Sequence, residues 1–281
     1  MSAPRAGRGR SVTWTWQLIV GVTAITMTCL LAFVGPFLAP HSTSEILGRP
    51  FGPPEPGALL GFDVLGRDVV SRLLSGGLSL VTMATIAASL GTIVGAFIGL
   101  VAASASPRVD AVIMRCLDLV LAFPTIVLAL LFVAILGAHP ALIVGIVALG
   151  HTPSVARIVR GAAGSIVSRD YVAWARSIGM RWSTIMTREV IPNIMSPLMV
   201  EFGLRLMWSV GSIAALSFLG YGIQPPAADW GLMVSENKSA LSQQPLSVVA
   251  PILAIAVFTI GANLIAEGLA RHVARTEGRS R

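Results

Sequence analysis

Two oppositely charged residues in an apolar part of the chain have the spacing of an ion pair. Glu201 and Arg205 are four residues apart, with the acid on the N-terminal side, which is the favourable order for a pair on a helix. Ionisable groups inside a membrane span are costly and mark functional sites in transport proteins. The pair therefore either stabilises its own helix or contacts a gate or a passing solute, and the sequence leaves both readings open.

Residue types for catalysis and nucleotide binding form no recognised pattern. The only lysine, Lys238, does not belong to a G-x-x-x-x-G-K-[ST] loop, so the chain cannot cradle ATP phosphates in that manner. Cys29 and Cys116 have neither disulfide nor metal-ligand spacing. The four histidines are scattered along the sequence, at His41, His139, His151 and His272. We therefore predict a chain with no catalytic residues, no metal site and no cofactor of its own.

A polar, arginine-rich stretch from Ser168 to Pro197 contrasts with the apolar chain on either side of it. Residues 119–156 contain no Asp, Glu, Lys or Arg, and only 12% of the whole chain is charged. Soluble domains carry about 25% charged residues. A polar loop of this length between apolar segments indicates a surface that binds a cytoplasmic partner.

The same loop predicts two short helices. Asp170 can cap a helix over 171–178, and Gly179 ends that helix. A second helix can run over 182–190, and Pro192 suits the first turn of the long helix that follows. The two helices would then form a rigid unit that lies along the membrane and is joined directly to two spans.

The apolar segments are long enough to cross a membrane, which takes about 20 residues for each span. We predict an all-α polytopic membrane protein with six transmembrane helices, at residues 17–39, 78–103, 116–136, 141–159, 194–219 and 246–268. Pro124 lies inside the third of these and either kinks it or is tolerated without a role.

The distribution of basic residues predicts the orientation of these spans. One side of the predicted membrane holds fifteen arginines: Arg5, Arg8, Arg10, Arg108, Arg115, Arg157, Arg160, Arg169, Arg176, Arg181, Arg188, Arg271, Arg275, Arg279 and Arg281. The other side holds four basic residues, Arg49, Arg67, Arg72 and Lys238. Because cytoplasmic loops carry the excess of positive charge, we expect both termini in the cytoplasm. The net charge of +7 is thus a topology signal, with the lipid bilayer as partner and no nucleic acid.

Two further patterns concern helix packing. Small residues recur at every fourth position of the second span, at Ala87, Gly91, Gly95, Gly99 and Ala103. Such a stripe lets another helix approach closely, either for packing or as a sliding surface. Just before this span, apolar residues over 69–74 share one helical face opposite a polar face that holds Arg67, Asp68, Ser71 and Arg72. This pattern predicts an amphipathic helix at the membrane interface.

The arginine-rich loop resembles the EAA loop of ABC-type importer permeases, whose pattern is E-A-A, three residues, Gly, nine residues and I-x-L-P. The matching positions are residues 173–175 (A-W-A), Gly179 and residues 189–192 (E-V-I-P). Ala173 stands where the family has its leading Glu, and Glu189 stands where it has Ile.

Three other segments, 59–80, 117–130 and 217–236, resemble the corresponding parts of one group within that family. The first contains L-G-F-D-V-L-G-R-D-V-V-S-R, in which Phe62 replaces the usual Thr. On these segments the chain is similar to the C-type permease subunits of dipeptide and oligopeptide ABC importers.

The resemblance implies a type I ABC importer permease fold with a cytoplasmic coupling helix, in the cell membrane of a bacterium. It implies a heterodimer with a B-type permease subunit, two cytoplasmic ATPase subunits that bind ATP and Mg, and an extracytoplasmic peptide-binding protein. The residues that it assigns to ATPase coupling are Tyr171, Ala173, Trp174, Ala175, Arg176, Ile178, Gly179 and Pro192.

On this basis the chain divides into four parts: a cytoplasmic basic tail at 1–16, a first span with an extracytoplasmic segment at 17–77, a permease core at 78–270 that includes loop 168–197, and a second basic tail at 271–281. The subunit would form half of a pathway for di- or oligopeptides, coupled to ATP hydrolysis through loop 168–192. Nickel, haem or another small solute is the alternative cargo within the family. Two other classes of protein are the alternatives to a permease subunit. A stand-alone channel or secondary transporter would work without partners, and an intramembrane enzyme would need a catalytic dyad.

Overall fold

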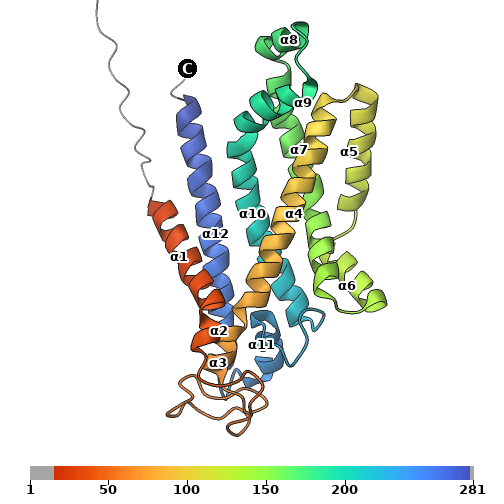
Figure 1. Ribbon diagram of the computed structural model, residues 1–281. Coiled ribbons are helices and arrows are strands. Elements are labelled where there is room, and N and C mark those ends of the chain that lie inside the picture. Colours follow the sequence, from red (N-terminus) through yellow and green to blue (C-terminus); the bar gives the residue numbers. More distant parts are fainter. Residues whose placement is uncertain (1–15, 279–281) are drawn as a thin grey trace, which may run out of the picture.

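Long apolar segments form the helices of the computed structural model, which describes residues 16–278 (Figure 1). The longest helices are α1 (Trp16–Phe33), α4 (Gly77–Ser104), α7 (Pro140–Val167), α10 (Ile191–Phe218) and α12 (Leu246–Gly278). The shorter ones are α2 (Gly35–Leu38), α3 (Val69–Ser75), α5 (Pro107–Leu121), α6 (Thr125–Leu136), α8 (Asp170–Ser177), α9 (Trp182–Ile185) and α11 (Trp230–Asn237). A π-helical turn covers Met186–Val190, and a 3-10 turn covers Lys238–Ala240. The described residues form no strand beyond isolated bridges, which confirms the predicted all-α class.

Five helical segments are long and apolar enough to span a membrane: Trp16–Phe33, Val69–Ser104, Pro140–Val167, Trp182–Phe218 and Leu246–Arg271. The pair α5 and α6 makes a sixth only as a broken span, because the two helices are bent by 72°. The predicted span over 116–136 is therefore broken at Pro124, which decides between the two roles that the sequence left open for this residue. Pro124 has no N–H for a helical hydrogen bond and disfavours helical backbone at Phe123, so α5 ends at Leu121.

The small residues of α4 lie against α7, which runs alongside α4 (Figure 1). A Cβ atom placed on Gly95 would lie 2.7 Å from the Cβ of Val155 and 2.8 Å from the carbonyl oxygen of Thr152. Cβ atoms on Gly91 and Gly99 would meet the backbone of α7 in the same way. The stripe is thus a close helix-to-helix contact that larger side chains would force apart.

The remaining long helices extend the bundle to one side. α12 packs between α1 and α10, and α10 also packs on α4 and α7. The largest apolar cluster joins these helices, and its buried members include Leu80, Ile143, Ile213, Trp230 and Phe258. The core therefore runs through the bundle from α7 to α12.

At one end of the bundle, the segment before α3 covers polar side chains of the predicted interfacial helix. Arg67 and Arg72 are buried, and Asp63 Oδ2 accepts hydrogen bonds of 2.6 Å from the guanidinium groups of both. Glu236, at the end of α11, accepts from the same two arginines at 3.0 and 2.6 Å. The predicted helix before the second span is present as α3, but Asp63 and Glu236 neutralise and cover the polar face that was expected to meet water.

The two ends of the bundle carry different segments (Figure 1). The start of α1, the end of α12 and the helix α8 lie at one end, and residues 39–68 with α11 lie at the other. The segments predicted to be cytoplasmic thus share one end within the described residues. Of the predicted basic tails, residues 1–15 and 279–281 lie outside those residues.

Candidate functional site

The loop between α7 and α10 begins with α8, whose first residue is Asp170. Arg169 occupies the N-cap with extended backbone, and no side chain caps the helix. The prediction of Asp170 as the cap is therefore wrong by one position. As the only acid in the first turn, Asp170 still interacts favourably with the positive end of the helix dipole.

A glycine turn ends α8. Gly179 has a φ of +79°, and its N–H donates to the carbonyl of Arg176 at 3.0 Å. The N–H of Met180 donates to the carbonyl of Ala175 at 3.1 Å. These two bonds form the Schellman motif, which needs a residue that tolerates left-handed backbone. The motif fixes the direction in which the chain leaves α8 for α9.

A small apolar cluster joins α8 to α9. Val172, Ala175 and Ile185 are buried together, and Met180 and Trp182 pack against them. The guanidinium of Arg176 lies 4.2 Å from the centre of the Trp182 ring, which adds a cation–π contact. The two short helices therefore hold each other as one unit.

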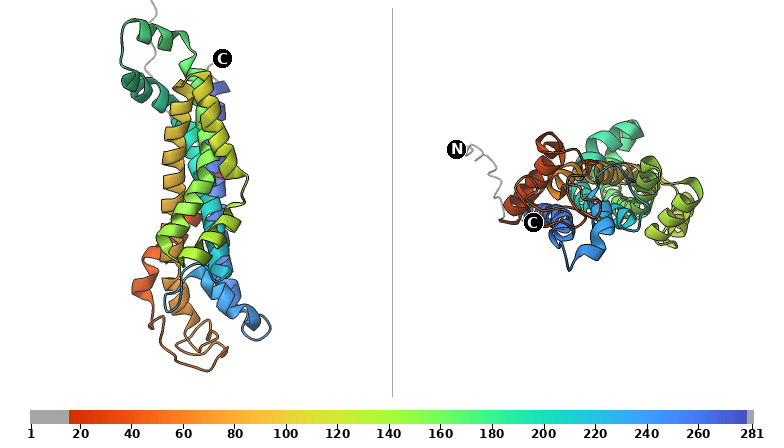
Figure 2. Two further views of the ribbon diagram at one scale, coloured as in Figure 1. Left: turned by 90° about the vertical axis from the view of Figure 1, so that its right-hand side faces the viewer. Right: turned by 90° about the horizontal axis from the view of Figure 1, so that it is seen from below.

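The outer face of α8 is apolar, aromatic and exposed. Tyr171, Trp174 and Ile178 have exposed fractions of 38%, 64% and 55%. Their spacing of three and four residues places them on one face of the helix. Figure 1 and the left view of Figure 2 show that α8 lies beyond the ends of the long helices. Large apolar groups at the tip of a projecting helix mark a protein contact.

The other residues that the sequence assigned to this surface lie in different places. Ala173, Arg176 and Gly179 are exposed on the loop, whereas Ala175 is buried in the apolar cluster. Pro192 is exposed but belongs to the first turn of α10. The structure thus groups most of the predicted set on one unit and removes Ala175 from its contact face.

Met186 connects this unit to the membrane bundle. Its side chain packs against the α8–α9 cluster and also against a second cluster that contains Val159, Val190 and Ile194. The helix is continuous in direction from Trp182 to Phe218, with the π-helical turn at Met186–Val190 inside it. Met186 therefore packs the α8–α9 unit against α7 and α10.

The predicted pair of Glu201 and Arg205 lies on α10, with 3.1 Å between Glu201 Oε2 and Arg205 Nη2. Glu201 is buried and Arg205 is largely covered. One turn further along α10, the Ser209 hydroxyl lies 2.9 Å from Nε2 of His151 on α7. The pair therefore lies inside the bundle, one turn from this polar contact and away from the exposed loop.

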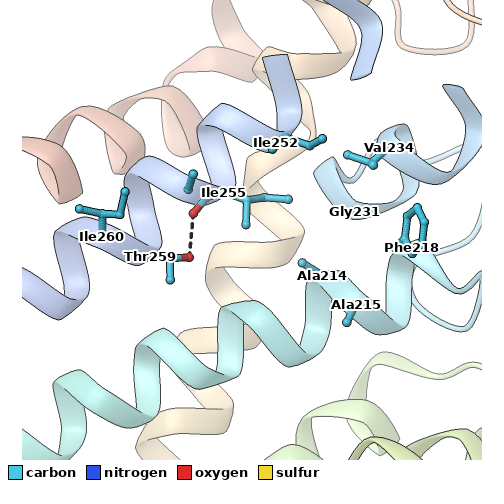
Figure 3. Close-up of a pocket in the computed structure, with 10 residues that line it drawn as sticks. Ala214, Ala215, Phe218, Gly231, Val234, Ile252, Ile255, Thr259 and Ile260 are labelled. Carbon is cyan, nitrogen blue, oxygen red and sulfur yellow. Dashed lines mark hydrogen bonds between the residues drawn. The ribbon is translucent and has the colours of Figure 1, made fainter. Parts of the chain in front are cut away.

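A cavity of about 470 Å³ lies between α10, α11 and α12 (Figure 3). The only polar side chain in its lining is Thr259, whose hydroxyl donates to the carbonyl of Ile255 at 2.8 Å. The cavity therefore offers no free side-chain donor to a polar solute.

Sequence reasoning missed the attachment of α11. Asp229 caps this helix, accepts from the Leu232 N–H at 3.1 Å, and also accepts from the Ser79 hydroxyl at 3.0 Å. Burial raises the pKa of Asp229, although these hydrogen bonds oppose the rise. The indole N–H of Trp230 donates to the carbonyl of Leu73 at 2.8 Å. The sequence signal for this attachment was an Asp, which favours the N-cap of a helix, followed directly by a large Trp side chain.

Residues 91–277 match the family model described as binding-protein-dependent transport system inner membrane component. The chain belongs to this family. The permease is therefore an integral inner-membrane protein and a non-catalytic subunit of an ABC importer. Membership also implies partners, namely a second permease, an ATPase and a binding protein.

Relatives and solved structures agree with this family. The glutathione transport system permease protein GsiD of Pectobacterium atrosepticum is 34% identical over 247 residues, 87% of this chain and 82% of that one. A protein of Brucella suis with the provisional name of a peptide transport system permease is 34% identical over 253 residues, 89% and 84% of the two chains. The inward-facing methionine ABC transporter MetNI aligns with a TM-score of 0.55 at 15% identity, over 70% of this chain and 96% of that chain. This likeness shows the type I ABC permease fold.

Proposed function

We propose that the permease forms half of the pathway of an ATP-driven importer of short peptides, together with a second, homologous permease subunit. The names of its relatives support a peptide cargo, because glutathione is itself a tripeptide. ATP and Mg²⁺ would bind to two partner ATPase subunits and not to this chain. A binding protein on the far side of the membrane would deliver the peptide.

The observation that carries the coupling role is the exposed face of α8. Trp174 is 64% exposed at the tip of the molecule, and Tyr171 and Ile178 flank it. Arg169, Arg176 and Arg181 are exposed on the same unit. Ala173 supplies no carboxylate where the family has Glu. The matching ATPase groove should therefore be apolar at its centre and acidic at its rim.

The route from this surface into the membrane follows the packing already described. Closure of the ATPases would move α8, and the Schellman turn at Gly179 would carry the movement to α9. Met186 would pass it to α7 and α10. The termini would lie on the ATPase side of the membrane, and residues 39–68 with α11 would face the binding protein.

The test is uptake by proteoliposomes that contain the permease, its second permease subunit, the ATPases and the binding protein. A radiolabelled tripeptide should accumulate only when ATP reaches the ATPase subunits. Excess unlabelled peptide should compete, whereas nickel and haem should not. ATP-driven uptake of nickel or haem without peptide uptake would reassign the cargo, and peptide uptake without the ATPases would refute the importer role.

A further inference from the structure

The break between α5 and α6 lies part-way along the bundle of long helices (Figure 1). α5 has 15 residues and α6 has 12, so at about 1.5 Å per residue they extend roughly 22 and 18 Å. The hydrocarbon core is about 30 Å thick, so neither helix crosses it alone. α5 starts beside the end of α4 and stops part-way along α4 and α7 (Figure 1). Residues 122–124 therefore interrupt the helix at bilayer depth.

Lipid cannot satisfy the backbone at such a break. Pro124 occupies the N-cap of α6 and forms no side-chain cap hydrogen bond. The first N–H groups of a helix have no partner within it. Residues 121–124 are exposed, and Phe123 has an exposed fraction of 58%. Irregular backbone at membrane depth persists only where protein covers it or water reaches it.

Charged side chains border the same break. Asp118 forms an ion pair with Arg157 of α7, and exposed fractions of 58% and 45% remain on the two side chains. Nearer the start of α5, Asp110 pairs with Arg160. Arg115 and Cys116 are exposed on the same helix. Such groups are costly against lipid and belong beside water or a polar partner.

The exposed side of α4 provides a contrast within the same bundle. Leu90, Ile93 and Phe97 have exposed fractions of 43%, 65% and 68%. α4 contains no Asp, Glu, Lys or Arg, and it has no break. Its exposed side is therefore uncharged throughout, whereas the exposed side of α5 places Arg115 and Asp118 among apolar residues such as Val112 and Leu119.

We propose that the break between α5 and α6, with the ion pair of Asp118 and Arg157 beside it, lines the water-filled pathway through which the solute crosses the membrane. Water in that pathway satisfies the free N–H groups of the first turn of α6 and hydrates the ion pair. The inference rests on the proposed importer function for the identity of the solute, and on the helix break and the charges for the presence of water.

Single cysteines can test the proposal in the assembled importer. With Cys29→Ser, the native Cys116 is the only thiol in the permease and needs no substitution in α5. Two further variants add Cys116→Ser, one with Phe123→Cys at the break and one with Leu90→Cys on α4 as the control. The control lies at a depth similar to that of the break. Position 90 on α4 and position 121, where α5 ends just before Phe123, are each roughly 21 Å along their helices from the same end of the bundle. The probe is a charged, water-soluble methanethiosulfonate reagent, applied without nucleotide and in the vanadate-trapped state.

We expect Cys116 and Phe123→Cys to react at least tenfold faster than Leu90→Cys in one of the two states. Equally slow reaction of all three cysteines in both states would overturn the proposal. Reaction of Phe123→Cys with a lipid-soluble maleimide alone would instead assign the break to lipid. Cross-linking of this cysteine to the second permease subunit without any aqueous reaction would assign it to a dry interface. Each result is read beside ATP-dependent peptide uptake, so failure of this inference is distinguishable from failure of the proposed function.

Discussion

Gly95 shows at the scale of single residues how tightly α4 and α7 approach. A Cβ there would lie 2.7 Å from Val155, so Gly95→Leu must separate the two helices. Overpacking of this kind costs about 1–3 kcal/mol. We expect a lower melting temperature of the purified permease in detergent. Gly145→Leu is the control, because a Cβ on Gly145 meets no atom within 4 Å. Equal melting temperatures for the two variants would contradict the packing described here.

Gly179 is required for its backbone and not for its size. Its φ is +79°, and a Cβ would meet no atom within 4 Å. A residue with a side chain in left-handed backbone costs roughly 1–2 kcal/mol. Gly179→Asp should therefore loosen the α8–α9 unit and accelerate tryptic cleavage after Arg176 and Arg181 several-fold. Gly161→Asp on α7, where space is also open and φ is ordinary, should leave the cleavage rate unchanged. No difference between the variants would show that the turn is unstrained.

The sequence predicted part of this site correctly for a physical reason. Glycine is the residue that ends a helix with left-handed backbone, so Gly179 could be placed from its spacing alone. The burial of Ala175 could not be predicted from the sequence, because it depends on the angle at which α9 folds back onto α8. Asp170 was misplaced by one position, since a cap and a first-turn acid both suit that end of a helix.

At the scale of elements, the buried ion network fastens α11 to the segment before α3. Asp63 is fully buried and accepts from both Arg67 and Arg72. Removal of one partner from a buried ion pair costs about 3–5 kcal/mol, because the remaining charge loses its compensation. Asp63→Asn should therefore lower the melting temperature and expose residues 39–68 to proteases. Glu45→Gln, at an exposed position of the same segment, is the control. If the two variants unfold alike, the network does not hold this end together.

The elements that hydrophobicity defines could be predicted, and those that depend on distant partners could not. Runs without charge identified the long helices to within a few residues at most ends. The network was missed because Glu236 is 164 residues from Arg72 in sequence. For the third span, composition predicted the apolar segment and left a kink at Pro124 open, because the direction after Pro124 depends on the packing of α6 against α7.

At the scale of the whole molecule, cytoplasmic ATPases can reach α8 in only one orientation of the permease in the membrane. The start of α1 and the end of α12 lie at the same end as α8. A reporter fused after Arg281 should therefore be active in the cytoplasm, and one inserted near Pro54 should be active outside. Arginine placement supports this orientation because positive loops stay inside. The reverse pattern at either position would place α8 out of reach of cytoplasmic ATPases.

We propose that the ATPases drive the permease through the exposed face of α8. The most direct measurement is peptide-stimulated ATP hydrolysis by the reconstituted importer carrying Trp174→Ala. Trp174 is 64% exposed and supports no buried cluster, so the subunit should insert and assemble normally. Phe97→Ala, at a 68% exposed apolar residue on the lipid-suited side of α4, is the matched control. We expect stimulation to fall at least tenfold with Trp174→Ala and to persist with Phe97→Ala. Full stimulation with Trp174→Ala would contradict the claim.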